Sequence, residues 1–333
     1  MTNVQRPDPQ ERPERMHPEA WTLTDGAAGN VRQAEALASA MGLAAEAWTL
    51  QPRAPWRWVA PRRWPGSRQA FGPAFATALG HPPALVVGCG RQAALATRLA
   101  RERGARALQI LDPRLTPAHW DLLVVPSHDG LRGDNVIPVM GSLNPVDDLW
   151  LAAARRDFAP LGTLPGPRTA LLVGGATHAG GFDVAAFERW LGALVAFVRG
   201  EGGSVLATAS RRTPAAAVAR LQANLEGVPG VVWAGTARAG EANPYPGLLG
   251  WADRIVCTAD SVNMLSEAAA TNVPVYVAGA AHGRPGRFVE ELQAMGRVRP
   301  LTARPEPFDV TALRETARVA AEARQRLGLW DAR

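Results

Sequence analysis

The sequence predicts an α/β protein with two Rossmann-like domains, in which buried parallel strands alternate with amphipathic helices. Short apolar runs are followed by glycine-bearing loops and then by helical patterns, and this order recurs along most of the chain. The 333 residues suit two domains of roughly 150 residues each. A Gly- and Pro-rich stretch at 162–167 marks the predicted boundary between them.

The composition is that of a globular protein with a cationic surface. Hydrophobic residues make up 47% and charged residues 20% of the chain, and the formal net charge is +6. This balance favours anionic partners, either nucleotide phosphates or an acidic membrane surface. All 36 basic residues are arginine, a bias better explained by GC-rich coding than by selection for phosphate backbones. We therefore expect no nucleic-acid partner.

Residues 1–20 predict a disordered tail, because they are polar, rich in proline and carry both signs of charge. They lack the apolar segment of a signal peptide, and the longest apolar run, 190–198, is far shorter than the ~20 residues of a spanning helix. We expect a cytoplasmic protein that reaches a membrane only peripherally. Cys89 and Cys257 exclude a disulfide framework, and without a Cys/His cluster neither a metal nor another cofactor is expected.

The predicted first domain spans residues 21–161. Strand patterns at 21–24, 44–50, 85–89, 107–111, 121–125 and 135–140 lead into polar or glycine-bearing loops. Because the carboxyl ends of parallel strands meet at one edge of a sheet, these polar side chains are expected to converge on a ligand site. The candidates are Asp25, Arg91, Asp112, Arg114, His128 and Asp129, with His128 a candidate general base.

Residues 51–73 interrupt this pattern with a stretch rich in Pro, Arg and Trp that lacks periodicity, which predicts an irregular surface excursion. Two interpretations stay open for Trp56, Trp58 and Trp64. Exposed among arginines, they would suit a membrane interface or an acceptor. In a plain loop, they would pack on the domain instead.

The segment Leu85–Ala93 supports a competing hypothesis. Its Gly-Cys-Gly-Arg-Gln-Ala matches a dinucleotide-binding fingerprint, and Asp112 ends the next strand at about the expected distance. This would indicate an NAD-dependent sugar-nucleotide enzyme. Against it, the motif falls on a third or later strand, and a chain without lysine cannot supply the Tyr-x-x-x-Lys pair that such enzymes normally need.

The predicted second domain spans residues 168–308, and a terminal helix at 309–330 is expected to pack back on the first domain. The centre of the second domain is the stretch 257–270, which indicates a buried strand, a turn and a helix capped by Asp260 or Ser261. Asn263 and Glu267 share one face of that helix. From spacing alone they fit either an ordinary packed helix with a solvated Glu267, or a phosphate site beside a carboxylate that holds sugar hydroxyls.

Several short motifs recur in the order typical of one family. They are Asp25-Gly26 with Gly29 and Gln33, Gln109 with Asp112-Pro113-Arg114, Pro126 with His128-Asp129 and Asn135-Val136, Gly174-Gly175, Ser210-Arg211-Arg212-Thr213, and Thr258 to Glu267. Over residues 20–327 the chain resembles bacterial relatives of the Elm (elongated-mitochondria) fission family, whose members look like GT-B glycosyltransferases. The resemblance implies two Rossmann-like domains facing across a cleft, with a nucleotide-sugar donor held by the second.

The resemblance also implies roles for particular residues. Glu267 would hold the donor ribose, and Arg211 or Arg212 would stabilise the leaving phosphate. A glycan or lipid acceptor would approach a base supplied by Asp25, His128 or Asp129; Asn30 stands where relatives commonly have histidine. The chemistry needs no metal, and the alternative is a non-catalytic fission-type adaptor that kept the fold. The donor-binding set is Gly174, Gly175, Thr177, Ser210, Arg211, Arg212, Thr213, Ser261, Asn263, Met264 and Glu267.

Overall fold

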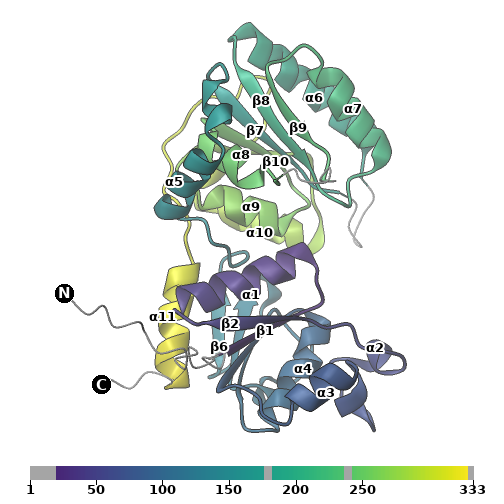
Figure 1. The fold of residues 1–333 in the computed structure, drawn as a ribbon. Coiled ribbons are helices and arrows are strands. Elements are labelled where there is room, and N and C mark those ends of the chain that lie inside the picture. Colours follow the sequence, from purple (N-terminus) through teal and green to yellow (C-terminus); the bar gives the residue numbers. More distant parts are fainter. Residues whose placement is uncertain (1–19, 176–181, 236–241, 329–333) are drawn as a thin grey trace, which may run out of the picture.

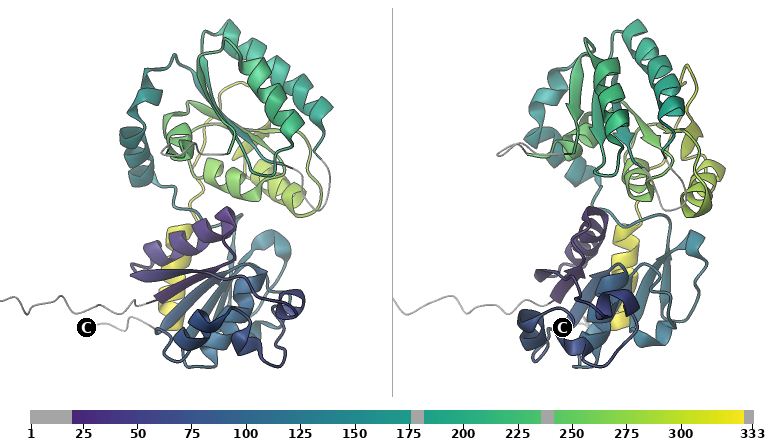
Figure 2. Two further views of the ribbon diagram at one scale, coloured as in Figure 1. Left: turned by 45° about the vertical axis from the view of Figure 1, so that its right-hand side comes forward. Right: turned by 90° about the vertical axis from the view of Figure 1, so that its right-hand side faces the viewer.

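A computed structural model describes residues 20–175, 182–235 and 242–328 of the chain. These residues form two α/β domains, each built on a six-stranded parallel sheet (Figure 1). The two further views in Figure 2 show the domains stacked one above the other. The predicted fold class is therefore confirmed. Residues 1–19, which include most of the predicted tail, lie outside the described residues.

The first sheet has the order β2-β1-β3-β4-β5-β6. Its strands are β1 (Ala20–Thr24), β2 (Ala45–Thr49), β3 (Leu85–Cys89), β4 (Arg106–Ile110), β5 (Leu122–Pro126) and β6 (Val136–Val139). The strand order reverses between β1 and β3, so the topological switch point lies above the carboxyl ends of these two strands. Asp25 follows β1 and Arg91 follows β3 closely, which places both residues beside that point.

Helices cover both faces of the first sheet. On one face, Leu37 of α1 (Ala28–Ala40) and the next residue after the helix, Met41, belong to the same apolar cluster as strand residues such as Val87. On the other face, α4 (Arg91–Arg101) and α3 (Pro73–Ala78) bury Leu95 and Phe75. The remaining short elements of this domain are α2 (Trp56–Val59), η1 (Ser67–Gln69), η2 (Pro117–His119) and η3 (Ser127–Asp129).

The second sheet has the order β12-β11-β10-β7-β8-β9, with its switch point between β7 and β10. Its strands are β7 (Arg168–Val173), β8 (Ser204–Ala209), β9 (Gly230–Trp233), β10 (Arg254–Thr258), β11 (Val275–Ala278) and β12 (Val298–Pro300). One face is covered by α6 (Val184–Gly200) and α7 (Ala215–Leu225). The other face is covered by α5 (Asp148–Asp157), α8 (Tyr245–Trp251), α9 (Val262–Ala269) and α10 (Gly283–Ala294).

The chain crosses between the domains earlier than residues 162–167, where the sequence led us to place the boundary. Helix α5 packs against α8, and Leu151 belongs to the apolar core of the second domain. In Figure 1, α5 lies beside the second domain, after a connection that leaves the end of β6. Residues 159–163 form a 3₁₀-helix, η4 (Ala159–Thr163), so the Gly- and Pro-rich stretch next to it is a turn within this domain.

The terminal helix α11 (Thr316–Leu327) returns to the first domain, where it packs beside α1, β5 and β6 (Figure 1). It begins later than the predicted position 309. The Leu313 amide donates to the Ala269 carbonyl at 2.8 Å, and Arg314 donates to the Ala270 carbonyl at 3.1 Å. Because these groups bond to the second domain, residues before Thr316 form an extended connection rather than helix.

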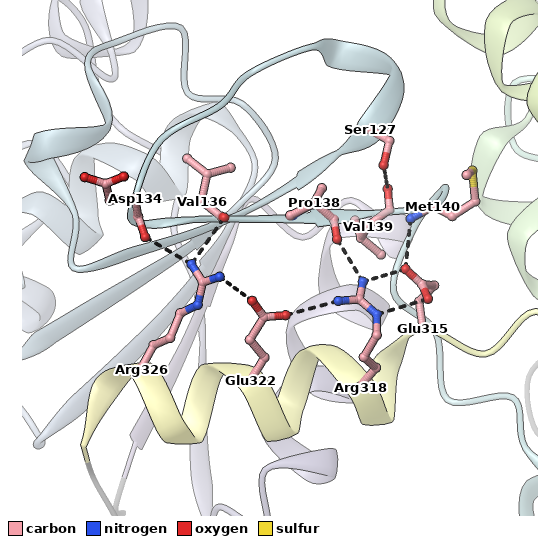
Figure 3. A network of polar contacts seen from close by, with 10 residues as sticks. All are labelled: Ser127, Asp134, Val136, Pro138, Val139, Met140, Glu315, Arg318, Glu322 and Arg326. Carbon is pink, nitrogen blue, oxygen red and sulfur yellow. Dashed lines mark hydrogen bonds and ion pairs between the residues drawn. The ribbon is translucent and has the colours of Figure 1, made fainter.

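Two arginines of α11 bind the outer side of β6, the edge strand of the first sheet (Figure 3). Arg318 donates to the Pro138 carbonyl at 2.8 Å. Arg326 donates to the Asp134 carbonyl at 3.0 Å. Glu322 lies between the two guanidinium groups and pairs with both. The helix therefore satisfies backbone groups that an edge strand otherwise exposes.

Candidate functional site

The stretch 257–270 folds as the strand β10, a turn and the helix α9. The Ser261 hydroxyl caps α9 by accepting from the Met264 amide at 3.4 Å, so Ser261 is the N-cap, one of the two predicted possibilities. Asp260 has a different partner: its carboxylate accepts from the Gly175 amide at 2.7 Å. The Asp260 carboxylate is thus turned toward the loop after β7.

The loops that follow β7, β8 and β10 are packed together at the switch point of the second sheet. A side chain at Gly174 would overlap the Asp260 carboxylate, and one at Gly175 would overlap the backbone of Arg212. The Gly174 amide donates to the Thr258 hydroxyl at 2.8 Å. Both glycines are therefore required by the close approach of neighbouring backbone and side chains.

The β8 loop is held by its own hydroxyl groups. The hydroxyl groups of Ser210 and Thr213 lie 3.1 Å apart, and Thr213 also donates to the carbonyls of Val173 and Gly174. Arg211 and Arg212 project from this fixed loop and are exposed, and neither forms an ion pair with another described residue. Two guanidinium groups are thus available to an anionic ligand. Thr177, another predicted donor-binding residue, lies outside the described residues.

A cavity of about 340 Å³ opens at this switch point, a volume within the range of small-molecule sites. Phe182, Phe187 and Trp190 form an aromatic wall that comes from α6 and the residues just before it. The opposite side is formed by residues at the ends of β7, β10 and β11. Among the described residues these are Gly175, Thr258, Ala259, Asp260 and Ala278 to His282.

Glu267 is buried at the contact between the domains, with 2% of its surface exposed. One carboxylate oxygen pairs with Arg32 of α1, and the other accepts from the Tyr245 hydroxyl of α8. The Arg32 guanidinium also lies 5.1 Å from the Tyr245 ring centroid. Burial, followed by the nearby Glu267 charge, raises the pKa of Tyr245 well above its usual value, so this phenol stays a donor. Glu267 is therefore neither solvated nor open to a ligand in this arrangement.

Asn263 lies one turn before Glu267 and also faces the first domain. A side chain at Gly29 would overlap the Asn263 amide, which shows how closely α1 and α9 approach. Met264 is partly buried in the core of the second domain. Further along α9, the Ser266 hydroxyl accepts from the Ser142 amide at 2.9 Å. The helix predicted to bind the donor therefore also contacts the first domain.

At the switch point of the first sheet, Asp25 forms a small polar cluster with Asn30. The Asp25 carboxylate accepts from the Asn30 side chain at 2.9 Å and from the Ala27 amide at 3.0 Å. Asn30 in turn accepts from the Cys89 thiol at 3.6 Å. Burial is the main reason that the pKa of Cys89 lies far above its usual value, so this thiol is not a nucleophile.

His128 and Asp129 lie in η3, which contacts α10 of the second domain. Arg284 pairs with the Asp129 carboxylate at 2.9 Å, and the His128 ring lies 5.8 Å from that of Phe288. Burial lowers the pKa of His128 and raises that of Asp129. The Nδ1 atom of His128 is buried and has no hydrogen-bond partner among the described residues.

Asp112 and Arg114 form a pair at 3.0 Å and lie within electrostatic range of Asp129. Arg91 behaves differently, because it donates to the carbonyls of Ala60 and Trp58 rather than facing the cleft.

Packing accounts for the two glycines of the segment that matches a dinucleotide-binding fingerprint. A side chain at Gly88 would overlap Thr97 and Gln109, and one at Gly90 would overlap Asn30.

Several residues of the site escaped the sequence analysis. Arg32 lay within an ordinary helical pattern, and nothing marked it as the partner of a residue 235 positions away. Tyr245 is one of only two tyrosines in the chain, a signal that could have drawn attention to it. The aromatic wall and Arg284 depend on how α6 and α10 pack. Among the described residues, no three His, Cys, Asp or Glu side chains gather in a way that could hold a metal.

The two facing Rossmann-like domains, with a cavity at the switch point of the second, define the GT-B fold. UDP-GlcNAc 2-epimerase from Neisseria meningitidis, solved with UDP-GlcNAc bound, has a TM-score of 0.52 and 13% identity, over 93% of this chain and 91% of that one. UDP-GlcNAc 2-epimerase from Methanocaldococcus jannaschii has a TM-score of 0.50 and 12% identity, over 91% of each chain. At these identities the likeness shows the fold alone.

The chain belongs to the family described as Mitochondrial fission ELM1, whose model matches residues 28–327. The Mitochondrial fission protein ELM1 of Arabidopsis thaliana is 30% identical over 279 residues. That alignment covers 74% of this chain and 64% of the relative, so the chain spans less than two thirds of the relative's length. The predicted family membership is confirmed. Among the described residues no helix is long and apolar enough to span a bilayer.

Proposed function

We propose that this protein is a GT-B glycosyltransferase that takes a nucleoside-diphosphate sugar as donor. The observation that carries the proposal is the 340 Å³ cavity at the switch point between β7 and β10. Its aromatic wall suits a sugar or base. The exposed Arg211 and Arg212 suit phosphates, and their loop packs against the lining residue Gly175. Open α/β sheets bind ligands at this position.

The donor would extend from this cavity along α9. From the N-cap Ser261 to Glu267 the helix rises about 9 Å, at about 1.5 Å per residue, which is long enough to place a ribose near Glu267 while the phosphates lie near Ser261. Glu267 is occupied by Arg32 and Tyr245. The ribose hydroxyls would therefore replace Arg32, and donor binding would separate α1 from α9.

In the proposed reaction, an acceptor hydroxyl attacks the anomeric carbon of the donor sugar. The bond from that carbon to the phosphate oxygen breaks, and the nucleoside diphosphate leaves while Arg211 or Arg212 stabilises its charge. Asp25, at the switch point of the first sheet, would accept the acceptor proton. His128 and Asp129 contact α10 instead and would help to position the second domain. The acceptor is a glycan or a lipid-linked hydroxyl.

Nucleoside diphosphates can be screened by thermal shift and the best one measured by calorimetry. Ala280 lines the cavity but is exposed, so Ala280→Trp would fill the site without disturbing the core. We expect it to weaken binding at least about tenfold, or about 1.4 kcal/mol. Ala185→Trp, at an exposed position of α6 outside the cavity lining, is the matched control and should bind as the wild type does.

The occupied Glu267 favours a second candidate, a non-catalytic adaptor in which the ion pair locks the domains together. The variant Arg32→Met separates the two functions. If a donor competes with Arg32, this variant should bind the nucleotide several-fold more tightly, because the cost of opening the pair is removed. Absence of saturable binding of every nucleoside diphosphate, by wild type and Arg32→Met alike, would overturn the transferase and favour the adaptor.

A further inference from the structure

The excursion formed by residues 51–73 exposes two large aromatic side chains. Trp58 is 67% exposed and Trp64 is 55% exposed. Among the described residues, only two other large hydrophobic side chains are as open, Leu149 and Met295, and both belong to the second domain. Trp56 is half-buried and packs on the first domain. The excursion therefore packs one tryptophan inward and presents the other two to solvent.

Specific contacts hold the excursion in place. The Trp56 indole donates to the Pro65 carbonyl at 3.0 Å, which ties the segment of Trp58 to that of Trp64. The Trp64 amide donates to the Ser67 hydroxyl at 2.8 Å. Where the excursion meets the rest of the first domain, Arg98 of α4 donates to the Pro61 carbonyl at 2.7 Å. These bonds fix the backbone that carries the exposed tryptophans, so their exposure is built into the fold.

The same excursion carries a concentrated positive charge. Residues 51–73 contain five arginines and no acidic residue, a local charge of +5 in a chain whose net charge is +6. All five are exposed, and among the residues that the structure describes only Arg63 of these five forms an ion pair, with Glu102 at 2.8 Å. The arginines are Arg53, Arg57, Arg62, Arg63 and Arg68.

The excursion adjoins the acceptor side of the candidate site. Arg91, the first residue of α4, binds the carbonyls of Trp58 and Ala60 at 2.9 and 2.6 Å. The residue before it, Gly90, lies against Asn30, which bonds to Asp25. A surface that docks on the excursion would thus lie next to the proposed proton acceptor.

We propose that this Trp/Arg excursion docks the protein on a bilayer rich in anionic phospholipid. Tryptophan prefers the interface between headgroups and acyl chains, where its ring is buried and its N–H stays hydrated. Arginines beside it are attracted to the negative surface potential of anionic lipids. Binding at this surface would bring a lipid-borne acceptor toward Asp25. Docking itself does not depend on the proposed transferase activity.

The test is co-sedimentation of the full chain with vesicles of phosphatidylcholine alone or of phosphatidylcholine with phosphatidylglycerol. We expect binding to the anionic vesicles, weakened by salt. The double variant Arg57→Gln/Arg62→Gln should lose about 25-fold in affinity, since each arginine near an anionic surface contributes roughly fivefold. Trp58→Ala/Trp64→Ala should lose at least about tenfold.

Matched controls lie in the second domain. Leu149→Ala/Met295→Ala removes the other exposed apolar side chains, and Arg189→Gln/Arg304→Gln removes two exposed charges. Both controls should bind vesicles nearly as the wild type does. Equal loss in the controls, equal binding to neutral vesicles, or tighter binding to duplex DNA than to anionic vesicles would each overturn the proposal. Nucleotide binding, measured on the same variants, should be unchanged, which keeps this result separate from the fate of the transferase proposal.

Discussion

At the scale of single residues, Glu267 shows how burial decides the role of a carboxylate. A charged group at 2% exposure is stable only if its oxygens are paired or hydrogen-bonded. Here a guanidinium from the first domain and a phenol from the second each take one oxygen. The same side chain therefore links the domains and is the group predicted to hold the donor ribose.

The two tyrosines of the chain offer a matched pair of substitutions. Tyr245→Phe removes a donor from a buried carboxylate and should lower the free energy of unfolding by about 1–3 kcal/mol. Tyr276→Phe removes a hydrogen bond to the Glu306 carbonyl, a neutral acceptor, and should cost about 0.5–1.5 kcal/mol. Urea unfolding of both variants measures the difference. A smaller loss for Tyr245→Phe than for Tyr276→Phe would contradict the assigned role of Tyr245.

His128 predicts a pH dependence of stability. Because burial holds its pKa below the usual value in the folded protein, the unfolded chain binds the proton more readily. This contribution to stability is present above about pH 6.5 and is lost as the pH falls from there toward the folded-state pKa. His128→Gln should therefore reduce the loss of unfolding free energy between neutral and mildly acidic pH. An unchanged pH profile in that variant would exclude His128 as its source.

At the scale of elements, the sequence could predict most strands and helices, because most apolar runs end in a polar or glycine-bearing loop. The capped helix at 262–269 is an example, since Ser261 is the N-cap and the apolar positions face the core. The start of α11 could not be predicted in this way. Its periodic pattern extends back to 309. The helix begins only at Thr316, because the Leu313 amide donates to a carbonyl of the second domain instead.

Helix α11 should protect the edge of the first sheet. Arg318→Ala and Arg326→Ala each remove exposed bonds to carbonyls of the β6 segment, so we expect each to cost up to about 1 kcal/mol. Amide hydrogen exchange should be faster in Val136–Val139 in the double variant. Arg103→Ala, at an exposed position of the first domain, is the control. Unchanged exchange in β6 would show that α11 does not stabilise this edge.

At the scale of the whole molecule, the sequence could predict two Rossmann-like domains but not how they meet. The contacts across the interface pair residues far apart in the chain, such as Gly29 with Asn263 and Asp129 with Arg284. Strand patterns carry no information on such pairings. The boundary was misplaced for a similar reason, because the apolar face of α5 shows that it packs on something, but not which domain.

The return of α11 has a consequence for motion. The chain enters the second domain after β6 and leaves it before Thr316, so the second domain is inserted into the first and tethered at both ends. A body held by two neighbouring tethers swings about the line between them more readily than it twists. Separation of Arg32 from Glu267 would thus follow one path, a hinged opening that widens the site on the side away from the two connections.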